Sequence, residues 1–138
     1  MPDNTNKLYQ EFPYLYRRRN QAAQACIGVY GFECGDGWFG LIRAFSEAIE
    51  RLARQEGREP HSETWPEAVQ VKQKAGRLRF YLAVYDEALR DCIEQAGDDS
   101  ERICEICGKP GSLKDASPGG VKTLCEDHSI DAERCQGR

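Results

Sequence analysis

Residues 69–82, V-Q-V-K-Q-K-A-G-R-L-R-F-Y-L, alternate apolar and polar side chains on both sides of a small Ala75-Gly76 step. A period of two places successive side chains on opposite faces of a strand, and a short run of small residues between two such segments is typical of a tight turn. The sequence therefore predicts an antiparallel β-hairpin with one face on a core. The apolar face is predicted to comprise Val69, Val71, Leu78, Phe80 and Leu82.

The opposite face of this hairpin carries four cations and a tyrosine. These residues are Lys72, Lys74, Arg77, Arg79 and Tyr81. Nowhere else in the sequence does periodicity concentrate positive charge on one face, which makes this the best candidate recognition surface in an otherwise acidic protein. A solvated outer sheet face explains the pattern equally well, because antiparallel sheets commonly expose a polar side.

An amphipathic helix is predicted before the hairpin. Its apolar residues recur at three- and four-residue steps, which indicates one buried stripe. They are Trp38, Leu41, Ile42, Phe45, Ala48, Ile49, Leu52 and Ala53. Asp36 stands where an N-cap belongs, and the helix should end near Glu56, before Gly57.

A second amphipathic helix is predicted after the hairpin. Its stripe runs from Tyr85 through Leu89 and Cys92 to Ala96, and we expect it to stop at Gly97-Asp98-Asp99. This acidic stretch is the candidate boundary between an α+β core, residues 1–98, and a C-terminal module with a short tail, residues 102–138.

Two matched pairs of metal-ligand residues lie in the C-terminal module, in C-E-I-C-G-K-P-G (104–111) and L-C-E-D-H (124–128). Two residues separate the members of each pair, so both can reach one ion across a tight turn. The predicted ligands are Cys104, Cys107, Cys125 and His128. Three thiolates and an imidazole are typical of a tetrahedral structural zinc site, in which no position remains for water or substrate. We expect one zinc ion whose binding energy contributes to folding.

The remaining cysteines leave two alternatives open. Cys135 follows His128 closely and could replace it as the fourth ligand. Cys26, Cys34 and Cys92 are interpreted as small apolar core residues, although Cys34 beside Asp36 also allows a nucleophile.

Residues 8–19, L-Y-Q-E-F-P-Y-L-Y-R-R-R, combine aromatic residues with three arginines, and Pro13 breaks any helix. In one interpretation Tyr14, Tyr16 and Arg17, Arg18 and Arg19 bind nucleotides. In the other, Phe12 and Leu15 anchor the segment on the core and the arginines are solvated. A short helix is predicted over 20–27.

Composition excludes several classes of protein. The 138 residues, 40% hydrophobic and 30% charged, are typical of a soluble globular protein, and no apolar run approaches the roughly 20 residues of a membrane helix. With no hydrophobic signal core at the N-terminus, we expect a cytoplasmic protein. A net charge of −4 disfavours generic nucleic-acid binding, which requires a basic surface. Motifs typical of NTPases, hydrolases, zinc proteases and deaminases are not found, and we do not expect an enzyme.

Three motifs in this order resemble a group of small uncharacterised zinc-binding proteins encoded by tailed bacteriophages and prophages. They are G-F-E-C-G-D-G-W-F (31–39), V-K-Q-K-A-G-R-L-R-F-Y (71–81) and the two ligand motifs. The resemblance covers residues 12–128, with Ala75 where the group usually has an aromatic residue. It implies a zinc-binding phage accessory protein with the same four ligands, and brings no established activity.

Together these observations predict an α+β fold: two amphipathic helices on an antiparallel hairpin, followed by a Cys3His zinc module. The predicted function is non-catalytic binding to a protein, and the resemblance suggests inhibition of a bacterial host defence complex of the CRISPR type. The alternative is a nucleic-acid-binding zinc protein that uses Arg17–Arg19 and the hairpin cations.

Overall fold

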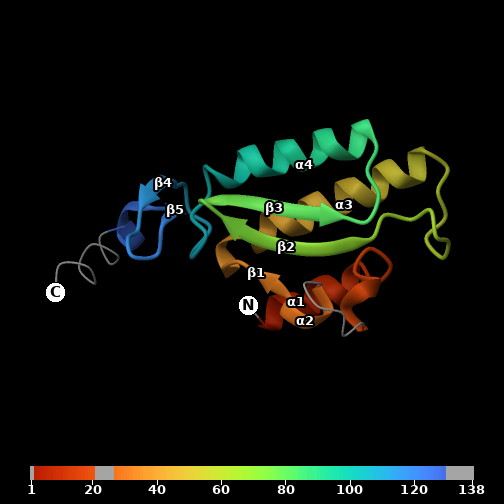
Figure 1. The fold of residues 1–138 in the computed structure, drawn as a ribbon, viewed down its shortest axis with the longest axis horizontal. Coiled ribbons are helices and arrows are strands. Elements are labelled where there is room, and N and C mark those ends of the chain that lie inside the picture. The colour runs from red at the N-terminus through yellow and green to blue at the C-terminus, as the bar shows by residue number, and fades with distance from the viewer. Residues whose placement is uncertain (1, 21–26, 130–138) are drawn as a thin grey trace.

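A three-stranded sheet lies at the centre of the fold (Figure 1), which the computed structural model describes over residues 2–20 and 27–129. Its strands are β1 (Phe32–Glu33), β2 (Ala68–Lys74) and β3 (Arg77–Leu82), in the order β1-β2-β3. β2 and β3 form an antiparallel hairpin, whereas β1 runs parallel to β2 and was not predicted. The helices are α1 (Pro2–Glu11), α2 (Ile27–Tyr30), α3 (Phe39–Gln55) and α4 (Glu87–Ser100), with 3-10 turns at Arg17–Asn20 and Asp36–Trp38. The α+β class and the antiparallel strand pairing are confirmed.

The hairpin turn is made by Ala75 and Gly76, which both have positive φ, 54° and 80°. This is the conformation that two-residue hairpins favour, because its twist matches that of the strands. In the resulting register Lys74 pairs with Arg77 and Lys72 with Arg79.

A β-bulge at Val69 changes the predicted inner face. Ala68 pairs with Leu82 and Gln70 with Tyr81, so Val69 is the extra residue. Ala68 is therefore fully buried while Val69 is only half-buried, and the prediction that Val69 shares the core face with Val71 is wrong. One inserted residue shifts a period-two pattern to the other face.

The buried stripe of α3 follows the predicted spacing. Trp38, Ile42, Ile49 and Ala53 have no exposed surface. The predicted cap is wrong, however: α3 begins after Trp38 without a side-chain cap, and Asp36 instead accepts a hydrogen bond from the Asn4 amide at 3.0 Å.

Helix α4 continues through Gly97-Asp98-Asp99, where the sequence predicted its end. The glycine leaves room for a side chain from the sheet: a Cβ on Gly97 would lie 2.6 Å from a guanidinium nitrogen of Arg77. At the N-terminus of α4, Asp86 caps the helix by accepting the Leu89 amide at 2.8 Å.

The N-terminal segment is anchored on the core. One buried cluster joins this segment to residues of β2, β3, α3 and α4. The segment contributes Leu8 of α1 and, after the helix, Phe12, Leu15 and Tyr16. Helix α1 was not predicted and ends before Pro13. Most of the helix predicted over 20–27 lies outside the described residues. Across the described part of the chain, none of the helices combines the length and apolar character needed to span a bilayer.

Candidate metal centre and binding surfaces

The four predicted ligands come from two turns of the C-terminal module. Cys104 and Cys107 lie on the turn after α4, which Gly108 closes with φ +81° while its amide donates to the Cys104 carbonyl at 2.9 Å. The antiparallel strands β4 (Ser112–Asp115) and β5 (Val121–Leu124) then return the chain to Cys125. His128 follows in one helical turn.

The ligand atoms of these four residues all lie within 4.8 Å of one another. Nδ1 of His128 is 3.5 Å from Sγ of Cys104 and 3.2 Å from Sγ of Cys125, and the sulfurs of Cys107 and Cys125 are 3.6 Å apart. Bonds of about 2.3 Å to sulfur and 2.1 Å to nitrogen give ligand separations of about 3.5–3.8 Å around a tetrahedral ion. The spacing therefore fits one metal ion. Cys135, the alternative ligand, lies outside the described residues.

The backbone around the cluster favours thiolates. Burial opposes ionisation of Cys104, but the amides of Cys107, Cys125 and Ile106 outweigh it and lower the pKa of this thiol to about 6. The pKa of Cys125 is lowered first by the His128 amide. Because a metal binds the thiolate, these amides prepare the site for a cation.

The same module contacts the α+β core through the C-G-D-G-W segment. The amide of Gly37 donates to the Glu105 carbonyl at 2.7 Å, and the Trp38 indole donates to the Ile103 carbonyl at 2.8 Å. A Cβ on Gly37 would lie 2.1 Å from the Cys104 carbonyl oxygen. Sequence reasoning missed this contact, although two glycines flanking Asp36 were a signal of close backbone approach.

A second contact joins the hairpin turn to the module. The Thr123 hydroxyl donates to the Gly76 carbonyl at 2.6 Å, and Thr123 is fully buried. A Cβ on Gly76 would lie 2.5 Å from the Leu113 side chain. The module that holds the candidate metal site and the hairpin are thus linked through directly packed residues.

The cations of the hairpin differ in how they are paired. Arg77 lies against α4 and forms ion pairs with Asp98 at 2.8 Å and Glu101 at 3.2 Å. Lys72, Lys74 and Arg79 form no ion pair within the described residues. The outer face therefore offers three cations to a partner, not four.

Tyr81 lies on the same outer face as these cations. Its side chain is 39% exposed, and the ammonium of Lys72 lies 5.7 Å from its ring centroid. The cation and the ring thus form one exposed surface.

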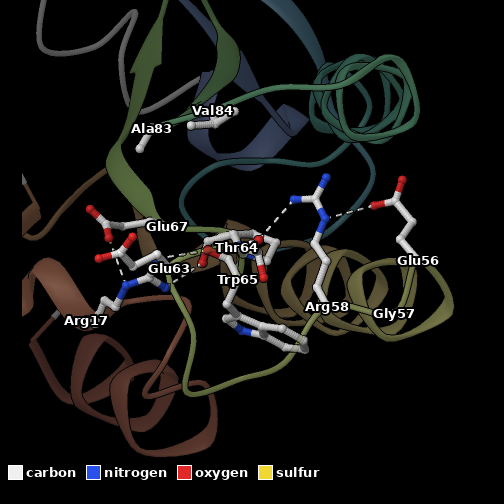
Figure 2. Close-up of a pocket in the computed structure, with 11 residues that line it drawn as sticks. Arg17, Glu56, Gly57, Arg58, Glu63, Thr64, Trp65, Glu67, Ala83 and Val84 are labelled. Carbon is white, nitrogen blue, oxygen red and sulfur yellow. Dashed lines mark hydrogen bonds and ion pairs between the residues drawn. The ribbon is translucent and has the colours of Figure 1, made fainter.

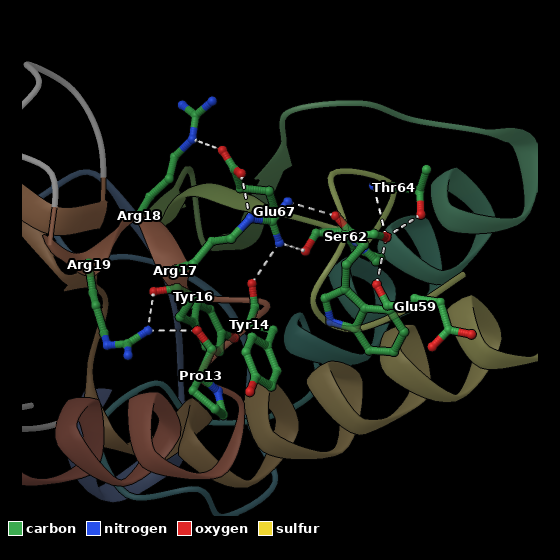
Figure 3. Close-up of polar contacts among 12 residues, drawn as sticks. Pro13, Tyr14, Tyr16, Arg17, Arg18, Arg19, Glu59, Ser62, Thr64 and Glu67 are labelled. Atoms are coloured by element: carbon green, nitrogen blue, oxygen red, sulfur yellow. Dashed lines mark hydrogen bonds and ion pairs between the residues drawn. The ribbon is translucent and has the colours of Figure 1, made fainter. Parts of the chain in front are cut away.

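Arg17, Arg18 and Arg19 are half-buried and bond to groups of this chain (Figure 3). Arg17 and Arg18 both pair with Glu67, and Arg19 donates to the Pro13 and Tyr16 carbonyls. Tyr16 is fully buried, so it offers no surface to a base. These arginines fasten the N-terminal segment to the rest of the chain. Their role therefore differs from that of the hairpin cations.

A hollow of about 570 Å³ between residues 56–67 and 83–84 contains charged groups that are already paired (Figure 2). Arg17 pairs with Glu67 at 2.8 Å, and Arg58 pairs with Glu56 at 3.3 Å and with Asp86 at 2.7 Å. These pairs leave the two guanidinium groups of the hollow neutralised by the chain itself.

The nucleophile considered at Cys34 is disfavoured by its surroundings. Burial, followed by the charge of Glu105, raises the pKa of the Cys34 thiol to about 12. Since the thiolate is the reactive form, the thiol is unreactive near neutral pH. The loop residue His61 contacts the Tyr14 hydroxyl at 3.3 Å.

Comparison with known proteins found no relative: no family model, curated protein or solved structure matches the chain. The geometry of the described residues therefore carries the proposals below.

Proposed function

We propose that this chain is a zinc-stabilised protein that acts by non-catalytic binding to another protein. Zinc is supported by the donor set, because three cysteines and a histidine close enough to share one ion suit a soft-to-borderline metal without geometric preference of its own. Four protein ligands close the coordination sphere, so the ion serves folding and not chemistry.

The observation that carries the binding function is the unpaired charge on the hairpin. Lys72, Lys74 and Arg79 share the outer face of β2 and β3. Arg77, at the turn end of that face, pairs with Asp98 of α4, so α4 supplies carboxylates only at that end. In a chain of net charge −4, three cations without an acid partner among residues 2–20 and 27–129 complement an acidic protein surface and would speed its association.

The nucleic-acid alternative loses part of its proposed contact surface. Arg17, Arg18 and Arg19 already donate to groups of this chain, so phosphate binding by them would require breaking those bonds. The resemblance to phage-encoded proteins would place the partner in a bacterial host, with a CRISPR-type defence complex as one specific candidate.

Charge reversal on the hairpin tests the binding function. The parent protein and the Lys72→Glu/Lys74→Glu variant would be used to capture partners from bacterial lysate, with and without nuclease. We expect a protein that the parent retains after nuclease treatment and the variant loses. Arg51→Gln is a control for the loss of exposed positive charge, since Arg51 lies on α3 and pairs with Glu47 of the same helix.

Two results would contradict the proposal. Equal capture of the partner by parent and variant would show that the hairpin lysines are not part of the interface. Capture that disappears with nuclease, together with salt-sensitive binding of purified nucleic acid, would favour the alternative.

A further inference from the structure

Strand β3 is an edge of the sheet, and a groove of about 370 Å³ follows it beside α4. The consecutive residues 77–81 line one side of the groove, and α4 supplies Arg90 and Ile93 on the other. Consecutive strand residues alternate between the two faces of a sheet, so only the strand's open edge can expose all of them to one groove.

One backbone amide of β3 on this edge has no partner among the described residues, and it belongs to Phe80, which is 3% exposed. The amides of Leu78 and Leu82 point away from β2 and donate to Ser100 Oγ and to the Tyr85 hydroxyl, each at 2.9 Å. Phe80 lies midway between them and faces the same direction, and its amide has no partner outside the hairpin among the described residues. Ser100 and Tyr85 thus close the two ends of the edge and leave its centre unpaired.

The groove is lined by three arginines and by Glu94, which pairs with Arg77 at 3.5 Å, so two of the arginines keep no acid partner among the described residues. Arg79 and Arg90 form no ion pair within residues 2–20 and 27–129, and Nε of Arg79 is buried without a hydrogen-bond partner. The Arg90 guanidinium lies 5.6 Å from the Tyr85 ring centroid, which holds it beside the groove. Most other arginines of the described chain bond to a carboxylate or a carbonyl, so two unpaired ones in a single groove indicate an anionic occupant.

We propose that this groove binds a short extended acidic segment of the partner protein, which adds to the edge of β3 at Phe80. The segment's backbone pairs with the Phe80 amide and carbonyl, and carboxylates at alternate positions lie on the face of Arg79 and Arg90. This inference rests on the proposed binding function and names the chemistry of its partner.

A peptide titration tests the proposal directly. The probe is acetyl-Val-Glu-Val-Glu-Val-Glu-amide, added to the 15N-labelled full chain, and its glutamine counterpart is the control peptide. We expect the Phe80 amide resonance to shift with the acidic peptide alone. N-methylation of the central peptide residues should weaken binding about tenfold, because it removes the donor that pairs with the Phe80 carbonyl.

Protein variants test whether peptide binding depends on the arginine charges of the groove or is non-specific. Arg79→Gln and Arg90→Gln should each weaken peptide binding about tenfold. Arg102→Gln should leave it unchanged, since Arg102 also forms no ion pair among the described residues but lies outside the groove. Circular dichroism of each variant would verify the fold.

An unchanged Phe80 resonance at about 1 mM acidic peptide, the weak end of specific affinity, would overturn strand addition. Equal binding of the glutamine peptide, or preferential binding of a single-stranded oligonucleotide in the same groove, would overturn the acidic segment. If lysate capture is lost in Lys72→Glu/Lys74→Glu but kept in Arg90→Gln, the binding function stands and the groove is not its site.

Discussion

At Gly37 the backbone of the α+β core lies directly against the backbone of Cys104 and Glu105, beside the candidate metal site. An added Cβ would lie 2.1 Å from the Cys104 carbonyl and 2.6 Å from the Glu105 carbonyl, so one of the two backbones must move. We expect Gly37→Ala to lower the free energy of unfolding by about 1–3 kcal/mol, the usual cost of overpacking. Urea unfolding followed by far-UV circular dichroism measures this change.

Gly40→Ala is the matched control for Gly37→Ala. Gly40 lies within α3 with nothing near its missing Cβ. Alanine there should stabilise the protein by about 0.5–1 kcal/mol, because it reduces the entropy lost on folding. If both variants change stability equally, the contact at Gly37 contributes nothing specific.

Cys107 is the one exposed cysteine among the four ligands, so its replacement disturbs packing least. Cys107→Ser should lose the metal, measured as zinc per protein by elemental analysis, because a hydroxyl does not replace a thiolate on zinc. Cys135→Ser should keep one equivalent. Zinc loss in Cys135→Ser would show that the ligand set is wrong.

At the scale of elements, α4 depends on its N-cap. Asp86 accepts the Leu89 amide, which is the main reason that the pKa of Asp86 is lowered, and it also pairs with Arg58 at 2.7 Å. Asp86→Ala should therefore cost about 1 kcal/mol at pH 7, measured by urea unfolding.

The same pKa shift fixes the sign of the pH dependence. A carboxylate with a lowered pKa stabilises the fold above its unfolded pKa, about 3.9, and loses that contribution as pH falls through the folded pKa. The difference between Asp86→Ala and the parent should shrink at pH 3. A difference that is equal at pH 3 and pH 7 would mean that ionisation of Asp86 is not involved.

At the scale of the whole molecule, metal binding should stabilise residues far from the ligands in sequence. The amides of Gly35 and Gly37 bond to Glu105, and Gly76 accepts the Thr123 hydroxyl. We expect a chelator to increase hydrogen exchange at Gly35 and Gly37 as well as in residues 102–129, and zinc to restore protection. Faster exchange confined to residues 102–129 would show that the ion stabilises the module alone.

Features that arise between neighbours in the chain could be predicted from residue spacing. The hairpin turn at Ala75-Gly76, the buried stripe of α3 and the clustering of Cys104, Cys107, Cys125 and His128 follow from spacing, because strand, helix and metal-site geometry repeat over a few residues. The half-burial of Val69 could not be predicted from the sequence, because the β-bulge depends on the pairing of Ala68 with Leu82.

Which charged groups remain available for a partner depends on contacts between segments that are distant in the sequence. Arg17 and Arg77 look like exposed cations in the sequence, but Glu67 and the acids of α4 neutralise them. Gly97 predicted a helix end, yet α4 continues through it, and the guanidinium of Arg77 occupies the space that a side chain at this position would fill. Charge pairing and close packing join residues tens of positions apart, and local periodicity carries no information about such distances.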